Sequence, residues 1–252
     1  KYNVSPIVIS KDGNHWRLTS VKNLLSLPDP NSLRKTGKDL AVPDSKEVQG
    51  TAEVAKRGTD VIFIAMHGPF GEDGTVQGML ELAGIKYTGP GVLASALGMD
   101  KIMFRKVMLS EGIASPKFVV LKKGDKIDET ISLIGKPPYF VKPYNQGSSV
   151  GASIAKSKKD LRKALSLAYK YSDTAIVDEY LQGLELTCAV IGNEKPIVLP
   201  VIEIHPLKGE FFDYESKYSE SGSEEIVPAR INKKLTEKIQ NLAVKVYKAI
   251  GA

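Results

Sequence analysis

The sequence of 252 residues contains one cysteine, one tryptophan and no long apolar run. Cys188 has no second thiol to pair with, so an internal disulfide is excluded and a reducing compartment is favoured. The longest apolar run, residues 61–66, is far shorter than the roughly 20 residues that a membrane-spanning helix needs. No signal-peptide pattern opens the chain. We therefore expect a cytoplasmic protein with no membrane partner.

The chain also lacks a strong excess of either charge. Its 35 Lys and Arg residues against 29 Asp and Glu give a net charge of +6 with the signs interleaved. Such a mild excess is compatible with anionic ligands, but no basic stripe indicates nucleic-acid binding. The apolar and charged fractions, 42% and 25%, are typical of folded globular proteins, and at about 150 residues per domain the length gives one to two domains.

Glycine and proline divide the chain into segments of alternating period, which predicts a mixed α/β fold. The apolar run at residues 61–66 predicts a strand buried on both faces of a parallel sheet. The other predicted elements are a strand at 85–88, helices at 76–83, 100–112, 158–171 and 233–250, a hairpin of 139–143 with 152–154, and strands at 117–121, 175–180, 185–191 and 197–204. In the helix at 100–112 we expect Ile102, Val107, Met108 and Leu109 to face inward.

Three other helices have apolar faces at helical spacing. In the helix at 76–83 the face consists of Val76, Met79, Leu80 and Ala83. Ser157 and Asp160 predict a capping box at the start of the helix at 158–171, with a buried stripe of Leu161, Ala164, Leu165 and Ala168. The helix at 233–250 has an apolar stripe of Leu235, Ile239, Leu242, Ala243 and Val246.

The tip of the predicted hairpin has the sequence GSSVG at residues 147–151. Glycines let a backbone approach an anion, and N–H groups together with hydroxyls can hold phosphate oxygens. Lys142 on the preceding strand strengthens a phosphate-binding interpretation, with a plain flexible turn as the alternative. The segment is not a Walker loop, because the chain has no GxxxxGK[ST] pattern.

Two further segments carry chemically useful side chains. The sequence HGPFGEDG at residues 67–74 places His67, Glu72 and Asp73 in one loop after a predicted strand. This loop could meet a ligand or a metal, and Asp73 could equally cap the helix that follows. The segment FFDYESKY at residues 211–218 reads as a surface loop or a lid, in which Lys217 could meet phosphate and Tyr218 a substrate.

Taken in order, these motifs resemble the D-alanine–D-alanine ligase family of the ATP-grasp superfamily. The motifs include HGxxGEDGxxQGxLE from residue 67, YTG from residue 87, MDK from residue 99, VKP from residue 141, GSSVG from residue 147 and DYxxKY from residue 213. The resemblance runs from residue 2 to the last residue. It implies an α/β fold, α+β in parts, with a parallel-sheet substrate domain over residues 1–98 and two α+β subdomains, 99–183 and 184–252, that clamp ATP.

The resemblance also implies roles for individual residues. Ser148 and Tyr218 correspond to catalytic residues that link the loops over the substrates. ATP is expected to meet Lys101, Lys142, Ser149, Asp178, Glu179, Leu181, Glu185, Tyr214 and Lys217, and D-alanine to meet His67 and Glu72. Asp178 stands where the family usually has Glu, so selection of the purine is expected to be looser.

The implied reaction joins two D-alanines through an acyl phosphate for peptidoglycan synthesis, with ATP and Mg²⁺ or Mn²⁺ as cofactors and a homodimer as the assembly. Tyr218 favours a peptide product, since ester-forming relatives carry His there. By the family's pattern both ends are incomplete: the first substrate's acid is expected before residue 2, and an arginine and the metal ligands after residue 252. We expect the chain alone to be inactive. The alternatives are an inactive nucleotide-binding module, which would not need Ser148 and Tyr218, and a ligase for another amino acid or carboxylate.

Overall fold

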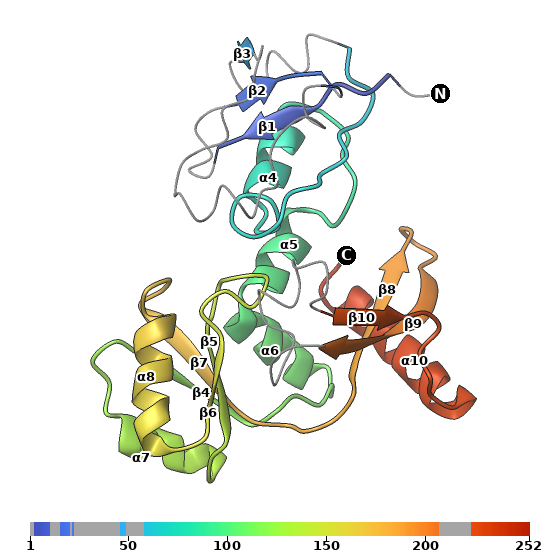
Figure 1. The fold of residues 1–252 in the computed structure, drawn as a ribbon. Helices are drawn as coiled ribbons and strands as arrows, with labels where there is room; N and C mark the ends of the chain where they lie inside the picture. Colours follow the sequence, from blue (N-terminus) through green and yellow to red (C-terminus); the bar gives the residue numbers. More distant parts are fainter. Residues whose placement is uncertain (1–2, 11–15, 21, 23–45, 49–57, 207–222) are drawn as a thin grey trace. The chain divides into compact units, whose positions relative to one another are not determined.

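A computed structural model describes residues 3–10, 16–20, 22, 46–48, 58–206 and 223–252 (Figure 1). The chain divides into two compact units. The first comprises Lys1–Ile64 and Val76–Thr88, and the second comprises Ala65–Thr75 and Gly89–Ala252. The domain boundaries expected at residues 98 and 183 stay predictions.

The first unit contains a three-stranded antiparallel sheet in the order β1-β2-β3, together with one helix. The strands are β1 (Ile7–Ile9), β2 (Trp16–Leu18) and β3 (Lys46–Val48), and the helix is α4 (Thr75–Leu82). Val76 and Leu80 are buried on the apolar face of α4, as the sequence predicts, and they form a core cluster with Trp16 and Ile85. Gly84 follows the helix with a φ of +67°, a left-handed conformation typical of a helix end.

The predicted strand at residues 61–66, buried on both faces, is wrong. In the described chain this segment makes a single parallel bridge, between Ile62 and Tyr87. Ile62 and Ile64 pack against the core of the first unit, whereas Val61 and Phe63 are exposed. An extended chain sends alternate side chains to opposite sides, and only one side is covered here. The parallel sheet expected for this region is limited, among the described residues, to that bridge.

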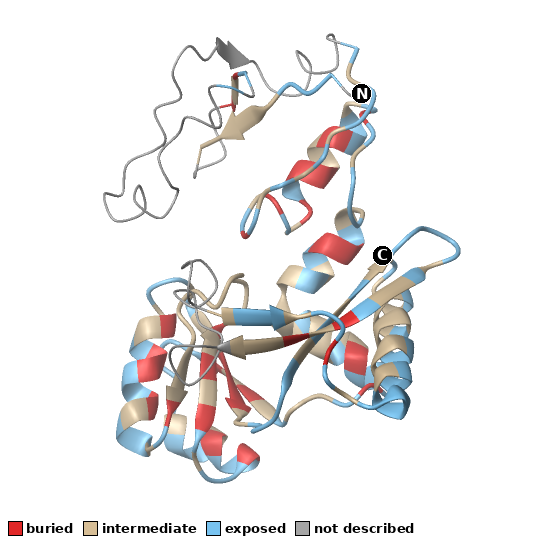
Figure 2. Ribbon diagram, turned by 45° about the vertical axis from the view of Figure 1, so that its right-hand side comes forward, coloured by how far each residue is buried: buried red, intermediate tan, exposed pale blue. Residues whose placement is uncertain are grey.

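The second unit contains a four-stranded antiparallel sheet in the order β4-β7-β5-β6. Its strands are β4 (Phe118–Lys122), β5 (Tyr139–Pro143), β6 (Ser153–Ala155) and β7 (Thr174–Glu179). Helix α8 (Lys158–Ala168) covers one face, with α7 (Ile127–Ile131) and the short helix η1 (Ser132–Ile134) beside it. The buried residues of α8 face the sheet (Figure 2). The predicted hairpin of β5 and β6 is confirmed.

Helix α8 begins where the sequence predicts a capping box. The hydroxyl oxygen of Ser157 accepts a hydrogen bond from the backbone N–H of Asp160, at 3.2 Å, and satisfies one of the free donors of the first turn. The helix buries the stripe Leu161, Ala164, Leu165 and Ala168. This stripe and the inward residues of the sheet form the largest core cluster described in the molecule.

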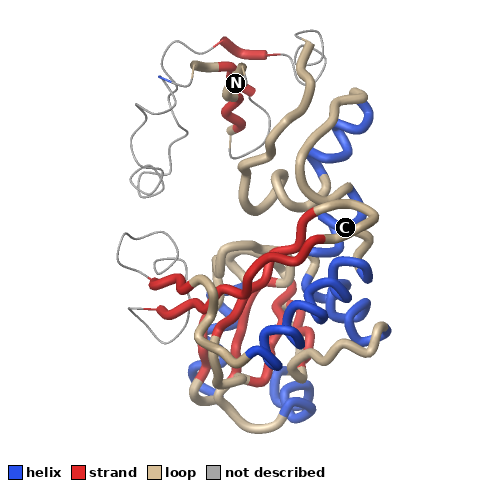
Figure 3. The backbone as a smooth tube through the Cα atoms, turned by 90° about the vertical axis from the view of Figure 1, so that its right-hand side faces the viewer, coloured by secondary structure: helices blue, strands red, loops and turns tan. Residues whose placement is uncertain are grey.

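A second sheet in this unit has the order β10-β9-β8 and is also antiparallel. Its strands are β8 (Glu185–Ile191), β9 (Ile197–Pro206) and β10 (Ser223–Ile226), and α10 (Lys233–Ala249) lies against β8 and β9 (Figure 3). The predicted apolar stripe of α10 exists, but Leu235 and Leu242 on it remain exposed among the described residues.

Two consecutive helices, α5 (Val92–Met99) and α6 (Lys101–Ser110), precede the four-stranded sheet in the chain. Asp100 starts α6 by accepting hydrogen bonds from the N–H groups of Ile102 and Met103. Met108 is buried as predicted, but Leu109 is 53% exposed, so its predicted inward orientation is wrong. No helix of the described chain has the length and apolarity to cross a membrane.

The packing of α8 predicts a large effect of truncating Leu161, which is 1% exposed. Leu161→Ala should lower the free energy of unfolding by about 3 kcal/mol, because the substitution removes buried methyl groups and leaves a cavity. Urea unfolding measures this change. Leu133→Ala, at a residue that is 75% exposed, is the matched control and should have little effect. Equal losses for both variants would contradict the described core.

Candidate functional site

The turn between β5 and β6 adopts an unusual backbone conformation. Ser148 and Ser149 have φ values of +50° and +57°, in the left-handed region that non-glycine residues rarely occupy. The turn is closed by hydrogen bonds from Val150 N–H to the Gly147 carbonyl and from Ala152 N–H to the Ser149 carbonyl, each 3.1 Å. Such strained residues cluster at ligand sites, so the geometry favours a binding turn over a plain flexible one.

Gly151 is required where the turn returns to β6. Its φ is +71°, and a Cβ placed there would lie 2.9 Å from Cγ of Pro143 and 2.7 Å from Cδ2 of Tyr171. A side chain would therefore force the turn away from the end of β5. Close packing at this point fixes where the two serines lie relative to the strand that carries Lys142.

The start of α6 is fastened to the same turn. The backbone N–H of Lys101 donates to the carbonyl of Tyr144, at 2.9 Å, and its ammonium group donates to the carbonyl of Gln146. Burial, together with the positive charges of Lys142 and Arg105, lowers the pKa of Lys101 to about 8. Two lysines that are far apart in the sequence thus lie close enough to repel each other.

One buried carboxylate holds two of the three cations of this site. Asp178 on β7 accepts two hydrogen bonds from the guanidinium of Arg105, at 2.5 and 2.8 Å. It also forms an ion pair with Nζ of Lys142, at 2.9 Å. Its side chain is 4% exposed, against 11% for Arg105 and 21% for Lys142. A buried charge is tolerated only when it is paired and hydrogen-bonded, and Asp178 meets this condition.

Two aromatic rings flank this carboxylate. In the strand register Asp178 lies opposite Phe118 on β4 and Phe140 on β5. The guanidinium of Arg105 lies 4.9 Å from the centre of the Phe118 ring, and the ammonium of Lys142 lies 5.0 Å from that of Phe140. Because side chains alternate along a strand, this row lies on the sheet face opposite the one that α8 covers.

The site therefore concentrates positive charge in a partly buried place beside strained serines. Asp100, a second carboxylate near Lys101, uses its side chain to cap α6. Ionised lysines in low-dielectric surroundings are stabilised by an anion, and phosphate groups are the anions that such Lys, Ser and backbone N–H sets bind. The arrangement is suited to a polyphosphate.

The loop at residues 67–74 reaches the turn through Glu72. Its carboxylate accepts a hydrogen bond from the N–H of Gly68, at 2.5 Å. The same carboxylate lies 3.5 Å from the position that a Cβ atom on Gly147 would occupy. His67 lies 3.7 Å from Glu72, with both side chains well exposed. Two loops that are distant in the sequence thus meet beside the serines.

Capping accounts for Asp73, as the alternative interpretation predicts. The carboxylate accepts hydrogen bonds from the N–H groups of Phe70, at 2.8 Å, and Thr75, at 3.0 Å, at the start of α4. Burial tends to raise the pKa of Asp73, but these hydrogen bonds outweigh burial and the pKa is lowered. The carboxylate is therefore ionised at neutral pH and stabilises the loop.

The remaining predicted site residues are placed separately. The carboxylate of Glu179 accepts a hydrogen bond from the backbone N–H of Lys117, at 2.7 Å. Leu181, between β7 and β8, and Glu185, at the start of β8, are exposed. Tyr214, Lys217 and Tyr218 lie outside the described residues. Among the described residues no three His, Cys, Asp or Glu side chains gather to hold a metal ion, so these residues do not fit a divalent-metal site.

Sequence reasoning missed Arg105. Its signal was its spacing: Arg105 follows Lys101 by four residues, which puts two cations on one face of α6. Like charges at this spacing are unfavourable unless a counter-ion or an anionic ligand lies nearby. The partner, Asp178, is 73 residues away in the sequence, so the pair could be recognised only in the fold.

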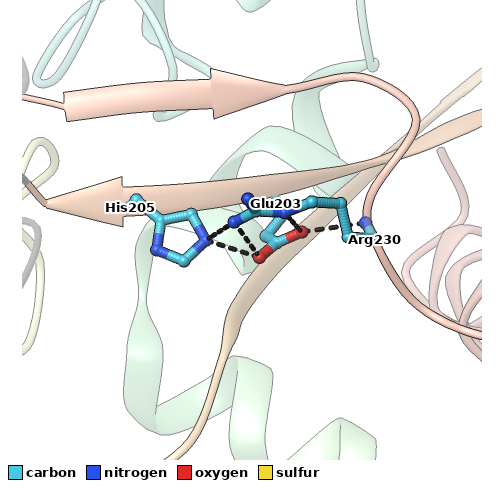
Figure 4. A network of polar contacts seen from close by, with 3 residues as sticks. All are labelled: Glu203, His205 and Arg230. Atoms are coloured by element: carbon cyan, nitrogen blue, oxygen red, sulfur yellow. Dashed lines mark hydrogen bonds and ion pairs between the residues drawn. The ribbon is translucent and has the colours of Figure 1, made fainter.

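A second polar cluster lies on β9 (Figure 4). Glu203 is almost fully buried and accepts hydrogen bonds from the backbone N–H of Arg230, at 2.8 Å, and from its guanidinium, at 3.0 and 3.2 Å. His205 contacts the same carboxylate and lies 2.7 Å from Nη2 of Arg230. Glu203 is opposite Ile226 in the strand register, so the cluster fastens the chain after β10 to β9.

Two parts of the chain match models of one protein family. Residues 1–90 match a family model described as D-ala D-ala ligase N-terminus, and residues 107–252 match one described as D-ala D-ala ligase C-terminus. The chain is 39% identical over 219 residues to the D-alanine–D-alanine ligase of Pelotomaculum thermopropionicum, covering 84% of this chain and 69% of the relative. It is 43% identical over 199 residues to that of Syntrophotalea carbinolica, covering 79% and 63%.

Among solved structures, the VanG D-Ala:D-Ser ligase from Enterococcus faecalis superimposes with a TM-score of 0.76 at 34% identity, covering 99% of this chain and 73% of that one. The fold is thus that of the ATP-grasp ligases, and the expected fold class is confirmed. Within that class, the chain belongs to the D-alanine–D-alanine ligase family. Enzymes of this family use ATP and a divalent metal ion. The chain spans about two thirds of the length of the curated relatives that it matches.

The Glu203 cluster generates a prediction about acid stability. Hydrogen bonds from the side chain and the backbone of Arg230, and the contact with His205, lower the pKa of Glu203 from 4.5 to about 2 against the effect of burial. A lowered carboxylate pKa stabilises the fold above pH ~4.5, and this stabilisation is lost as the pH falls toward 2. Glu203→Gln should therefore lower the unfolding midpoint at pH 7 and flatten its decline between pH 5 and pH 2.

Thermal unfolding followed across this pH range measures the effect. Glu225→Gln, at an exposed residue on β10, is the control and should follow the wild-type profile. A constant difference between Glu203→Gln and wild type at every pH would show that the Glu203 carboxylate is not held ionised by its partners.

Proposed function

We propose that the protein joins two D-alanines to D-alanyl-D-alanine for peptidoglycan synthesis, with conversion of ATP to ADP and phosphate. A carboxylate oxygen of the first D-alanine bonds to the γ-phosphorus of ATP. The bond between the γ-phosphorus and the oxygen that bridges the β- and γ-phosphates breaks, and ADP leaves. The amine of the second D-alanine then attacks the acyl carbon and loses a proton to solvent, and phosphate leaves. Family membership and the cationic site support this assignment.

The cluster of Lys101, Arg105 and Lys142 around Asp178 is the observation that carries the proposal. Phosphoryl transfer needs little covalent help from a protein, and its catalysis rests on positioning and charge stabilisation. Lys101 and Lys142 neutralise the phosphates of ATP. Ser148 and Ser149 in their strained turn cover those phosphates, which keeps water away from the acyl phosphate.

The proposed roles of the other residues follow the family. The closeness of Glu72 to the turn supports a role for His67 and Glu72 in binding the first D-alanine. Glu179 and Leu181 line the adenine side and Glu185 meets the ribose. Asp178, whose two carboxylate oxygens are paired with Arg105 and Lys142, acts on ATP only through those two cations. Tyr214 and Lys217 bind ATP, and Tyr218 acts with Ser148 over the substrates. We propose a substrate domain over residues 1–98, two ATP-binding subdomains divided near residue 183, Mg²⁺ or Mn²⁺ as the metal, a homodimer and a cytoplasmic location.

Related ligases differ in the second amino acid that they join to D-alanine. A structural relative is named a D-Ala:D-Ser ligase, whereas the two curated relatives described above are named D-alanine–D-alanine ligases. We therefore propose D-alanine in both positions, with D-serine as the competing second substrate.

Amino-acid-dependent release of ADP tests the reaction. The full-length protein should release ADP with D-alanine alone, and mass spectrometry should detect D-alanyl-D-alanine as the main product when D-serine is present in equal amount. Lys142→Met should lower kcat/KM about 100-fold, the usual effect of removing one group that stabilises transition-state charge. Lys136→Met, at an exposed residue, is the control. ATP binding without turnover would support a binding module, and a preferred D-alanyl-D-serine product would assign the second substrate to D-serine.

The lowered pKa of Lys101 gives the pH dependence of ATP binding. Without ATP, Lys101 loses its proton as the pH rises through about 8. Phosphates favour the charged form, so the dissociation constant for ATP should rise above pH 8 by up to about tenfold per pH unit. Isothermal titration between pH 7 and pH 9.5 measures this change. Lys101→Arg stays charged throughout, so its profile should be flat. A flat wild-type profile would contradict the role given to Lys101.

A further inference from the structure

Arg105 belongs to the cationic cluster, but the proposed function assigns it no contact with ATP or D-alanine. It comes from α6, lies over the ring of Phe118, and binds both oxygens of Asp178. Lys142 pairs with the same carboxylate through Oδ2. Two cations therefore share one buried anion, and Lys101 adds a third positive charge close enough to interact with both cations.

The charge count shows what Arg105 does for Lys142. With Arg105 present, Asp178 is divided between two partners, and the pair Arg105 and Lys142 retains one surplus positive charge. Without Arg105, Asp178 would neutralise Lys142 alone, and the surplus would vanish. An ammonium group that is fully neutralised by a carboxylate at 2.9 Å attracts phosphate only weakly.

We propose that Arg105 is a positioning residue that occupies the Asp178 carboxylate and so leaves Lys142 free to bind the phosphates of ATP. The inference rests on the proposed function, because it takes ATP as the ligand of Lys142. It assigns to Arg105 no contact with the nucleotide. Its effect passes through Asp178, which is held on the row between Phe118 and Phe140.

The decisive experiment is a double-mutant cycle on the full-length protein, with the dissociation constant of ATP measured by isothermal titration. Arg105→Met should weaken ATP binding about tenfold, as expected for the loss of one unit charge in a partly buried site. Asp178→Asn added to Arg105→Met should restore binding to within about threefold of wild type, since it removes the anion that traps Lys142. Arg105→Lys keeps the charge and should bind ATP nearly as wild type does.

A merely structural role predicts the opposite order, because two altered buried residues should do more harm than one. The proposal is overturned if the double variant binds ATP as weakly as Arg105→Met or more weakly, or if Arg105→Met binds as wild type does. Lys106→Met on the exposed side of α6 is the control for loss of a charge without loss of the pair. If Arg105→Met does not fold, Asp178→Asn alone decides: weaker ATP binding than wild type overturns the proposal.

The wild-type protein separates this inference from the proposed function. If wild type binds ATP but joins no amino acids, the ligase assignment fails while the affinity order of the variants still tests Arg105. If wild type turns over D-alanine and the variants do not follow the predicted order, only the role of Arg105 is lost.

Discussion

The candidate site depends on a buried carboxylate with more positive charge around it than it can neutralise. Taking Asp178 out of water is unfavourable unless its oxygens are paired, and Arg105 and Lys142 supply that pairing. Burial lowers the pKa of Lys101, and the positive charge that this pairing leaves uncompensated among the described residues adds to the effect. The fold thus maintains an electrostatic arrangement that a polyphosphate would complete.

Three elements of the second unit carry these charged side chains. Strand β5 carries Lys142, β7 carries Asp178, and α6 carries Lys101 and Arg105. Helix α8 and its core occupy one face of the four-stranded sheet, and the charged row lies on the other. The close contact at Gly151 and the hydrogen bond between the backbones of Lys101 and Tyr144 keep the serine turn beside the lysines. Packing on one face of the sheet therefore supports the candidate site on the other.

Local patterns in the sequence predicted the parts of this scaffold that local interactions determine. The capping box at Ser157 and the stripe from Leu161 to Ala168 needed only short-range spacing, and both are confirmed. The run at residues 61–66 failed because periodicity does not tell whether a second layer covers Val61 and Phe63. The pair of Arg105 with Asp178 was not predictable, because only the tertiary fold brings residues 73 positions apart together. The resemblance to the ligase family, by contrast, came from motifs and is confirmed.

The most direct measurement of the central claim is a crystal structure of the full-length protein with a non-hydrolysable ATP analogue. The account predicts that Nζ of Lys101 and of Lys142 each lie about 3 Å from a phosphate oxygen, with Arg105 still bound to both oxygens of Asp178. Phosphates bound elsewhere, with Lys142 paired to Asp178 alone, would contradict it.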